Sequence, residues 1–377
     1  MNTGSALPYA LYLDTKIAGA AAQLATYFLS GVFDASRTAV YVKKHKKHHR
    51  AVERVLSSAG LDFRFMSPGD LDGLREQTVF YLFNAQSNCR LVANRHLKHI
   101  FITHGESNKI SSIKPITRIY DHVVMSGRLS LSRYYRSGLF DAHDYATRRL
   151  VMMGDTFIGR TQLGSAGETP VLFYAPTWEG GLPAEDYSSL GSRHACSALL
   201  HFSDLCGVRD ILVKPHPNLG HRLPVYLDHL VNLLSRLARS GLKMHLQGNN
   251  VRLSMLQRLR LHAAGISRTN RPGDFHAVHA LIDVSAMETQ CINEEIPYHV
   301  LLDETRHDLA RYVAADHLEL YEQIAIHLGR DKVRFPDRLE TDALRAFRDL
   351  VICYSDPSWR GQGPADRLIN LVKYTSS

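Results

Sequence analysis

The stretch Val171-Leu-Phe-Tyr-Ala-Pro-Thr-Trp178 predicts a buried β-strand that ends at a proline. In open α/β sheets, ligands bind just beyond the carboxyl ends of the strands, so Thr177 and Trp178 occupy a position where ligands usually lie. Three further apolar stretches deliver polar residues to a strand exit in the same way: His99-Ile-Phe-Ile-Thr-His-Gly105, Ile211-Leu-Val-Lys-Pro-His-Pro217 and Ala280-Leu-Ile-Asp-Val-Ser285. This repeated layout is the strongest indication of function in the sequence.

Outward from this stretch, strands and helices alternate in both directions, which is typical of parallel sheets. We expect strands at 9–13, 39–42, 63–65, 79–83, 99–103, 120–125, 150–153, 171–174, 211–213, 243–246, 280–283 and 300–302. We expect helices at 16–29, 51–59, 86–97, 129–138, 192–205, 224–240, 341–350 and 365–374.

The polar, glycine-rich segment 159–170 is the best candidate for a linker between two domains. The chain has 377 residues, a length that suits two domains better than one core. We therefore predict an α/β protein with two doubly wound, Rossmann-like domains and a cleft between them. Residues 1–160 would form the N-terminal, acceptor-side domain. Residues 161–377 would form the C-terminal, donor-binding domain, with the last helix packing back on the first domain.

The composition is that of an ordinary globular protein, with 45% hydrophobic and 22% charged residues. A net charge of +8 and an isoelectric point near 9.2 favour anionic partners such as phosphates, nucleic acid or an acidic membrane face. Five scattered cysteines without a CxxC pair favour reduced thiols in a cytosolic chain. The sequence shows neither a signal peptide at its start nor a run of about 18 apolar residues, so we expect no transmembrane helix.

The densest basic run, at 43–50, contains Lys43, Lys44, Lys46, Lys47 and Arg50. It is either a solvated helix start or a patch for anionic lipid head groups or a polyanionic acceptor. A nucleic-acid site is disfavoured because no aromatic residue is interleaved with the charges.

His104 follows the strand at 99–103 and precedes Gly105, which lets a ligand approach the backbone. This position suits a general base, although a structural histidine has the same pattern.

Lys214 and His216 lie in a loop that two prolines stiffen. A rigidly held cation and imidazole suit a pyrophosphate leaving group, and the alternative is a rigid surface turn.

The stretch from Asp283 to Thr289 reads as a strand, a loop and the start of a helix. Ser285 would cap this helix with Glu288 at the capping-box position, and the free N–H groups would bind a phosphate. Asp283 or Glu288 would hold ribose hydroxyls, with Thr289 in the same nucleotide-binding set. The alternative is a well-capped helix that binds no ligand, which explains the same residues equally well.

Other common sites are disfavoured by the sequence. The histidines at 45, 48 and 49 have no matching cysteines or carboxylates, so we predict no metal site and no cofactor. The chain has no GxxxxGK[ST], GxGxxG or GxSxG motif, which disfavours P-loop, standard dinucleotide and hydrolase sites.

In chain order, these motifs resemble those of the CDP-glycerol glycerophosphotransferase family, the polymerases of teichoic acids and capsules. The resemblance covers residues 99–377. It rests on His104-Gly105, Tyr120-Asp121 through Ser126, Tyr174-Ala-Pro-Thr-Trp178, Lys214-Pro-His-Pro217, Ile282-Asp-Val-Ser285 and Asp366-Arg367.

The resemblance implies a glycosyltransferase-B-type fold and transfer of an alditol phosphate, glycerol phosphate first, from a CDP-alditol to a hydroxyl acceptor without an essential metal. His104 would be the base, and His216, Lys214 and the Ser285 region would hold the CDP phosphates. The acceptor would be lipid-linked or polymeric, and the protein would lie at the cytoplasmic face of the plasma membrane.

Val284 and Ala286 stand where the family has tyrosine and serine. These departures keep three alternatives open. One is a nucleotide-sugar glycosyltransferase of the same fold, another is a sugar-nucleotide 2-epimerase of related fold, and the last is a degenerate member that only binds polyanion or membrane.

Overall fold

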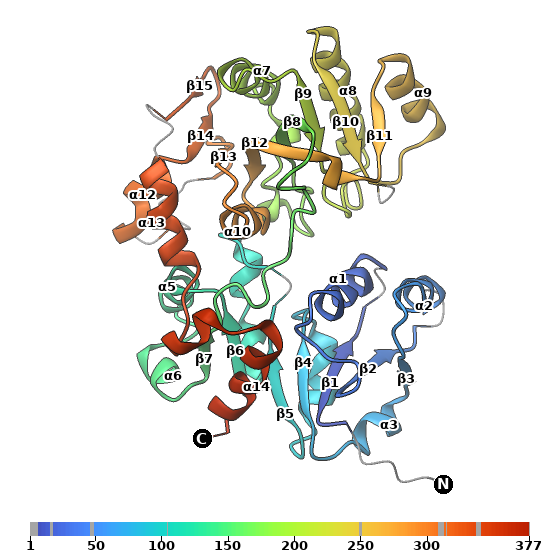
Figure 1. The fold of residues 1–377 in the computed structure, drawn as a ribbon, viewed down its shortest axis with the longest axis vertical. Coiled ribbons are helices and arrows are strands. Elements are labelled where there is room, and N and C mark those ends of the chain that lie inside the picture. Colours follow the sequence, from blue (N-terminus) through green and yellow to red (C-terminus); the bar gives the residue numbers. More distant parts are fainter. Residues whose placement is uncertain are drawn as a thin grey trace. The chain divides into compact units, whose positions relative to one another are not determined.

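The computed structural model describes residues 7–15, 18–45, 49–103, 105–248, 251–307, 313, 315–336 and 341–376. The chain forms two compact units (Figure 1). Unit 1 comprises Met1–Glu106, Ile113–Gly159 and Leu350–Ser377, and unit 2 comprises Ser107–Ser112 and Arg160–Asp349. In the described ranges, no helix is long and apolar enough to cross a membrane.

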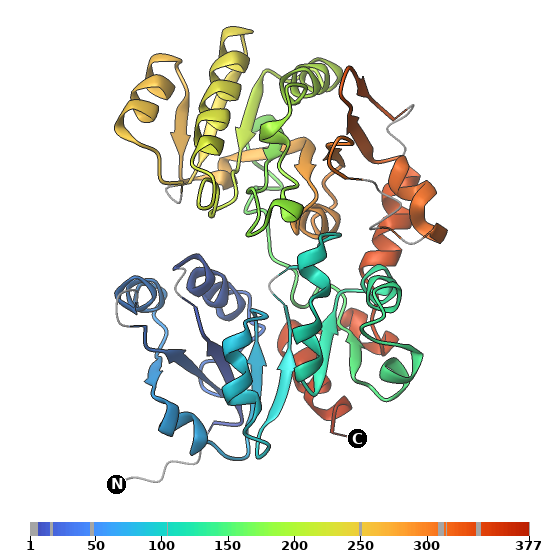
Figure 2. The same ribbon diagram turned by 180° about the vertical axis from the view of Figure 1, so that it is seen from behind.

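Unit 1 is built on a seven-stranded sheet in the order β3-β2-β1-β4-β5-β6-β7, in which all neighbours are parallel (Figure 2 shows it from behind). Its strands are β1 (Tyr9–Leu13), β2 (Thr38–Lys43), β3 (Arg64–Met66), β4 (Thr78–Tyr81), β5 (Lys98–Phe101), β6 (His122–Met125) and β7 (Leu150–Met152). Its helices are α1 (Ala18–Leu29), α2 (His49–Ser58), α3 (Pro68–Asp72), α4 (Cys89–Val92), α5 (Arg128–Arg136), α6 (Ala142–Ala146) and α14 (Pro364–Tyr374).

Both faces of this sheet are buried, which is why its strands are almost entirely apolar. Side chains alternate between faces along β1: Leu11 and Leu13 join a core with residues of α1, α2 and α14, whereas Ala10 and Tyr12 join a second core with residues of α4 and α5. The C-terminal segment is tied to unit 1, since Lys98 Nζ donates to Thr375 O at 3.1 Å.

Unit 2 has an eight-stranded sheet in the order β11-β10-β9-β8-β12-β13-β14-β15, parallel except for the antiparallel β14–β15 pair. Its strands are β8 (Thr169–Ala175), β9 (Asp210–Val213), β10 (Lys243–Gln247), β11 (Ser267–Thr269), β12 (Phe275–Asp283), β13 (Tyr298–Leu302), β14 (Ala325–Leu328) and β15 (Val333–Arg334). Its helices are α7 (Ala195–Leu205), α8 (Val225–Arg239), α9 (Met255–Ala263), α10 (Met287–Asn293) and α12 (Leu318–Glu322), and α13 (Thr341–Val351) leads out of it.

The predicted α/β class is confirmed: the chain has two doubly wound, Rossmann-like units. Some elements differ from the prediction. The helix expected over 86–97 is a short 3₁₀ turn followed by four residues of α4, because Asn94 uses its amide to bond Leu71 O and Leu74 O. The strand expected at 280–283 begins earlier, at Phe275, and carries a register shift between Ala277 and His279.

In each sheet the winding direction reverses once, between β1 and β4 in unit 1 and between β8 and β12 in unit 2. At such a switch point the loops after the two central strands diverge and leave room for a ligand beyond the strand ends. In unit 2 the two strands end at Ala175 and Asp283, which brings two of the stretches singled out in the sequence side by side.

Candidate functional site

The switch point of unit 2 is organised by the carboxylate of Asp283. Ala175 pairs with Ile282 in the β8–β12 ladder, so the residues just after β8 lie beside the end of β12. Asp283 Oδ2 accepts hydrogen bonds from Thr177 N at 2.7 Å and Ser189 N at 3.1 Å. The side chain is fully buried, and its other oxygen, Oδ1, has no hydrogen-bond partner among the described residues.

A buried lysine completes this cluster. Lys109, from the short segment Ser107–Ser112 of unit 2, donates from Nζ to Thr177 Oγ1 at 2.7 Å. Its ammonium lies 5.5 Å from the ring centroid of Tyr187, a distance suited to a cation–π contact. We call Lys109, Thr177, Asp283 and Ser189 the Asp283 cluster.

Burial shifts the pKa values of both charged side chains of the cluster, Asp283 and Lys109, toward 7. It raises the pKa of Asp283 to about 7, against the hydrogen bonds from Ser189 and Thr177 and the charge of Lys109, which lower it. Burial lowers the pKa of Lys109 to about 8, while nearby carboxylates, Asp283 first, oppose this shift. Such a pair can hold or release a proton near pH 7, and the lysine can offer its charge to an anionic ligand.

A second layer fixes the loop that carries Tyr187 and Ser189. The guanidinium of Arg306 donates to Asp186 Oδ2 at 3.0 Å, and His307 Nε2 lies 2.6 Å from Asp186 O. The His307 ring stacks on Tyr187 with centroids 4.0 Å apart. These contacts hold the ring of Tyr187 in place beside the Lys109 ammonium.

Trp178, which follows Thr177 of the cluster in the sequence, lies against His216. Their rings stack with centroids 5.7 Å apart, and His216 Nδ1 accepts from Asn218 N at 3.1 Å. Because Nδ1 accepts, the ring proton lies on Nε2 when the imidazole is neutral. The neighbouring Glu179 is fully buried and accepts from Gly220 N, Arg222 N and Leu223 N, so it locks the loop after β8 to the loop after β9.

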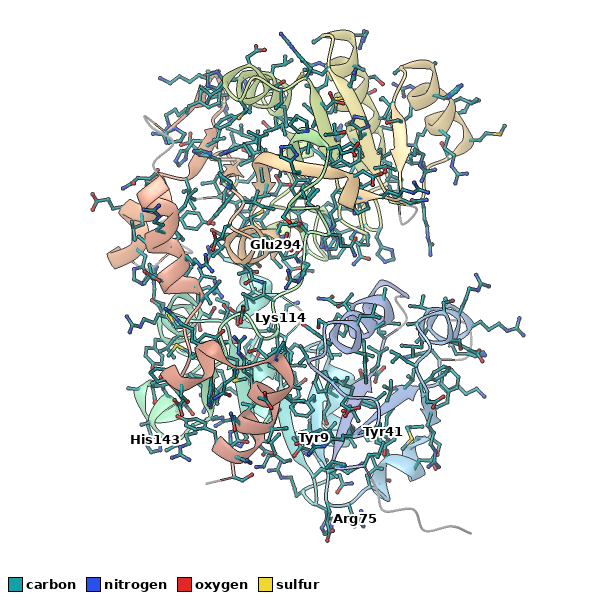
Figure 3. The ribbon with its side chains drawn as sticks, in the orientation of Figure 1. Tyr9, Tyr41, Arg75, Lys114, His143 and Glu294 are labelled. Carbon is teal, nitrogen blue, oxygen red and sulfur yellow. The ribbon has the colours of Figure 1, made fainter. Side chains whose placement is uncertain are left out.

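Lys214 is not brought into the Asp283 cluster. Its Nζ donates to Thr161 O at 2.9 Å, and Thr161 N in turn donates to Glu294 Oε1 at 2.9 Å (Glu294 is labelled in Figure 3). Burial lowers the pKa of Lys214 to about 8, and the charge of Glu294 opposes this shift. Lys214 therefore ties the loop after β9 to the start of unit 2, and Thr161 ties that segment to Glu294 at the end of α10.

The capping box predicted for the helix after β12 is wrong. The N-cap of α10 is Ala286, which makes no side-chain cap, and Ser285 Oγ instead accepts from Met287 N at 3.3 Å. Glu288 points into the core, where Tyr298 OH and Tyr321 OH each donate to its carboxylate at 3.2 Å. Thr289 Oγ1 donates to Ala286 O within the helix.

His104 lies outside the described residues, and its role as a base stays a prediction. The chain around it is shaped by Thr103 and Gly105, whose φ angles are +55° and +137°. Two residues further on, Glu106 is buried and accepts from Ser126 N at 3.0 Å and Ser126 Oγ at 2.6 Å. These bonds anchor the loop after β5 to the end of β6.

The basic run predicted as a patch is described only in part, since Lys46 and Lys47 fall outside the described residues. Lys43 Nζ pairs with Asp14 at 3.0 Å, Lys44 lies 5.9 Å from the ring centroid of Phe65, and Arg50 is exposed on α2. Part of the charge of this run is therefore compensated locally.

The sequence reasoning did not single out Lys109, Tyr187 or Ser189. Lys109 had one usable signal, since it is a cation five residues after the His104 position at a strand exit. The other two lie in a loop without regular periodicity. The described part of the chain holds no group of three or more histidine, cysteine, aspartate or glutamate side chains that would suit a metal ion.

No protein-family model matches the sequence, and no curated protein matches it. Among solved structures, the chain is similar to a putative UDP-N-acetylglucosamine 2-epimerase from Listeria monocytogenes, with 10% identity, coverage of 98% of this chain and 96% of that one, and a TM-score of 0.47. It is similar to UDP-GlcNAc 2-epimerase from Neisseria meningitidis bound to UDP-GlcNAc, with 11% identity, coverage of 98% and 99%, and a TM-score of 0.46. It is also similar to MurG from Acinetobacter baumannii, with 8% identity, coverage of 98% and 99%, and a TM-score of 0.42.

Proposed function

We propose that the chain is a transferase that takes an alditol phosphate, glycerol phosphate first, from a CDP-alditol donor and passes it to a hydroxyl acceptor. The observation that carries this proposal is the Asp283 cluster, where a buried cation lies at the switch point of a mostly parallel sheet beside a carboxylate oxygen that has no hydrogen-bond partner among the described residues. A nucleoside diphosphate ester supplies both an anion for Lys109 and hydroxyl or amino donors for Asp283 Oδ1.

In the proposed reaction, the acceptor oxygen attacks the phosphorus that carries the alditol. A new P–O bond forms, the bond to the bridging pyrophosphate oxygen breaks, and CMP leaves with the electron pair. His104 would take the hydroxyl proton. Lys109 would stabilise the charge that develops on the phosphates, because phosphoryl transfer depends mainly on positioning and charge stabilisation.

The proposed acceptor is lipid-linked or polymeric, as in the synthesis of teichoic-acid-like or capsular polymers. The protein would then work at the cytoplasmic face of the plasma membrane, held there peripherally. The positive net charge of +8 supports contact with such acceptors and with anionic lipids.

A second candidate is a degenerate member that binds a polyanion without catalysis. It is favoured by Ala286, which leaves the N-cap of α10 without a side-chain acceptor at a place where the resembled family has a serine. A nucleotide-sugar glycosyltransferase is the third candidate, since the same cluster would accept a uridine or guanosine diphosphate ester.

A thermal-unfolding panel with CMP, CDP, CDP-glycerol, CDP-ribitol, UDP, UDP-GlcNAc and GDP distinguishes these candidates. A ligand that binds only the folded state at a hundredfold excess over its Kd stabilises the protein by about 2.7 kcal/mol. Stabilisation by cytidine nucleotides alone is expected. Stabilisation by uridine or guanosine nucleotides alone would replace the alditol-phosphate proposal with glycosyl transfer, and no stabilisation by any nucleotide would leave the non-catalytic candidate.

A further inference from the structure

Helix α9 turns an apolar face outward. Met255, Leu256 and Leu259 are 77%, 74% and 53% exposed, although each is large and hydrophobic. Leu261 is buried and anchors the opposite side of the helix in the unit 2 core. With 3.6 residues per turn, the three exposed residues share one face and Leu261 faces away from it.

Arginines flank this face on both sides. On the helical wheel, Arg258 lies to one side of the Met255–Leu256–Leu259 face and Arg260 lies to the other. Arg258 Nε donates to Leu253 O at 3.1 Å and Arg260 Nη2 donates to Asn232 Oδ1 at 2.6 Å, so both guanidinium groups are held near the helix by neutral acceptors.

The surroundings of α9 are strongly basic. The segment 251–274 contains five arginines, one aspartate and no glutamate. Within the ranges that the structure describes, no carboxylate forms an ion pair with Arg252, Arg258, Arg260 or Arg271. Helix α9 lies beside β11, the strand at one end of the sheet order, so the sheet continues no further on this side (Figure 1).

We propose that α9 docks unit 2 on an anionic lipid surface, with Met255, Leu256 and Leu259 inserted among the head groups and Arg258 and Arg260 bound to lipid phosphates. An amphipathic helix with apolar residues on one face and arginines beside it is the kind of element that lies in a membrane interface. The inference rests on the peripheral membrane location in the proposed function and assigns that location to a surface.

Two other occupants fit this face less well. In a symmetric dimer formed through α9, the flanking arginines of one copy would approach the same arginines of the other, which is unfavourable because like charges repel. Nucleic acid would match the charge, but it would leave the three aliphatic side chains without aromatic or apolar partners in a polar groove.

The experiment is co-sedimentation of the full chain with phosphatidylcholine vesicles that contain or lack phosphatidylglycerol. We expect binding only with phosphatidylglycerol, and weaker binding at high salt because ions screen the attraction. The triple variant M255Q/L256Q/L259Q should bind at least about tenfold more weakly. The double variant R258Q/R260Q should bind these vesicles roughly thirtyfold more weakly, since each basic residue near a charged surface contributes about fivefold to the affinity.

The matched control is L29Q/L182Q/L205Q, which removes three comparably exposed leucines elsewhere and should bind as the wild type does. Thermal unfolding of every variant confirms that the fold is intact. A second comparison, K43Q/K44Q/R50Q, removes the described charges of the basic run and should leave most binding in place.

Three results would overturn the proposal. They are unchanged binding by the α9 triple variant, equal binding to vesicles without phosphatidylglycerol, and a wild-type dimer that M255Q/L256Q/L259Q converts to monomer without affecting vesicle binding. Nucleotide stabilisation is measured without vesicles, so failure of the donor proposal and failure of the docking proposal are separate outcomes.

Discussion

The ammonium of Lys109 donates to the hydroxyl of Thr177 at 2.7 Å, although 68 residues separate them in the sequence. Thr177 also donates its backbone N–H to Asp283, so one threonine bridges a buried cation and a buried carboxylate. All three residues belong to unit 2, because Ser107–Ser112 packs with that unit. The cation of the cluster is thus supplied by a short segment that lies between two parts of unit 1 in the sequence.

Replacing Lys109 by methionine should weaken donor binding. The substitution keeps an unbranched side chain that is one atom shorter and removes its charge, and a hydrogen bond to a charged group contributes about 1.5–3 kcal/mol. We expect the Kd for the stabilising nucleotide to rise at least about tenfold, measured by calorimetry or thermal shift. The control is Lys114→Met, at an exposed lysine labelled in Figure 3, which should bind as the wild type does. Equal affinity for K109M and wild type would remove Lys109 from the donor site.

Asp283→Asn should change how stability depends on pH. The folded-state pKa of Asp283 is raised to about 7, so folding takes up a proton between about pH 4 and pH 7. The wild type therefore loses stability as pH rises through this window, by up to about 4 kcal/mol for a shift of about three units. Asparagine can still accept from Thr177 N and Ser189 N but does not titrate.

Urea unfolding of both proteins at several pH values measures this effect. The stability of D283N relative to wild type should grow from pH 4 to pH 7 and level off above it. Since both proteins share every other titrating group, a difference that stays constant across the window would show that Asp283 titrates at an ordinary pKa.

Much of the fold could be predicted because long apolar runs in the sequence determine where the buried strands lie. The expected strand at 9–13 coincides with β1, since five apolar residues are followed at once by Asp14 and Thr15. Helix α9 was missed although Ser254 and Gln257 form its capping box. Its outer face is apolar, so the usual alternation of buried and exposed positions is absent there.

The candidate site could be predicted only as separate pieces. Thr177 and Asp283 were each singled out because each follows an apolar strand. Their contact depends on β8 and β12 being neighbours, and these strands are more than 90 residues apart in the chain with three strands between them in sequence order. The roles of Lys214 and Glu288 were harder to infer, because each side chain has a structural partner far away in the sequence or in the core: Lys214 bonds Thr161 O, and Glu288 accepts from Tyr298 OH.

Glu106→Gln should loosen the loop that carries position 104. The carboxylate accepts from Ser126 N, Ser126 Oγ and Ser130 Oγ and pairs with Arg133 at 3.5 Å. An amide cannot accept at both ends, so we expect a loss of about 1–3 kcal/mol in unfolding free energy. If His104 is the base, kcat for transfer should fall at least about tenfold, because small displacements of a catalytic group are costly.

The control for this prediction is Glu53→Gln, at an exposed position on α2. Nucleotide stabilisation should be unchanged in E106Q, since the proposed donor contacts belong to unit 2. A stability loss without any change in kcat would separate this loop from the chemistry, as would wild-type transfer by His104→Ala.

A buried histidine pair should make the protein acid-sensitive. His279 Nε2 and His299 Nδ1 lie 2.8 Å apart inside unit 2, packed against Phe202. Burial lowers the pKa of His279 to about 3, with the charge of His299 adding to the shift, and burial lowers the pKa of His299 to about 4. Unfolded histidines bind protons below about pH 6.5, so the folded state loses stability as pH falls from there toward 4.

The double variant H279L/H299L removes both titrating groups and puts apolar side chains of similar size in their place. Across pH 6 to 4.5 the wild type should lose up to roughly 2–3 kcal/mol more per pH unit than this variant, as measured by urea unfolding. H221L/H262L, at two exposed positions, serves as the control and should follow the wild type. If the wild type and H279L/H299L instead lose stability in parallel, the pair is protonated in the folded protein, and acid sensitivity must come from other groups.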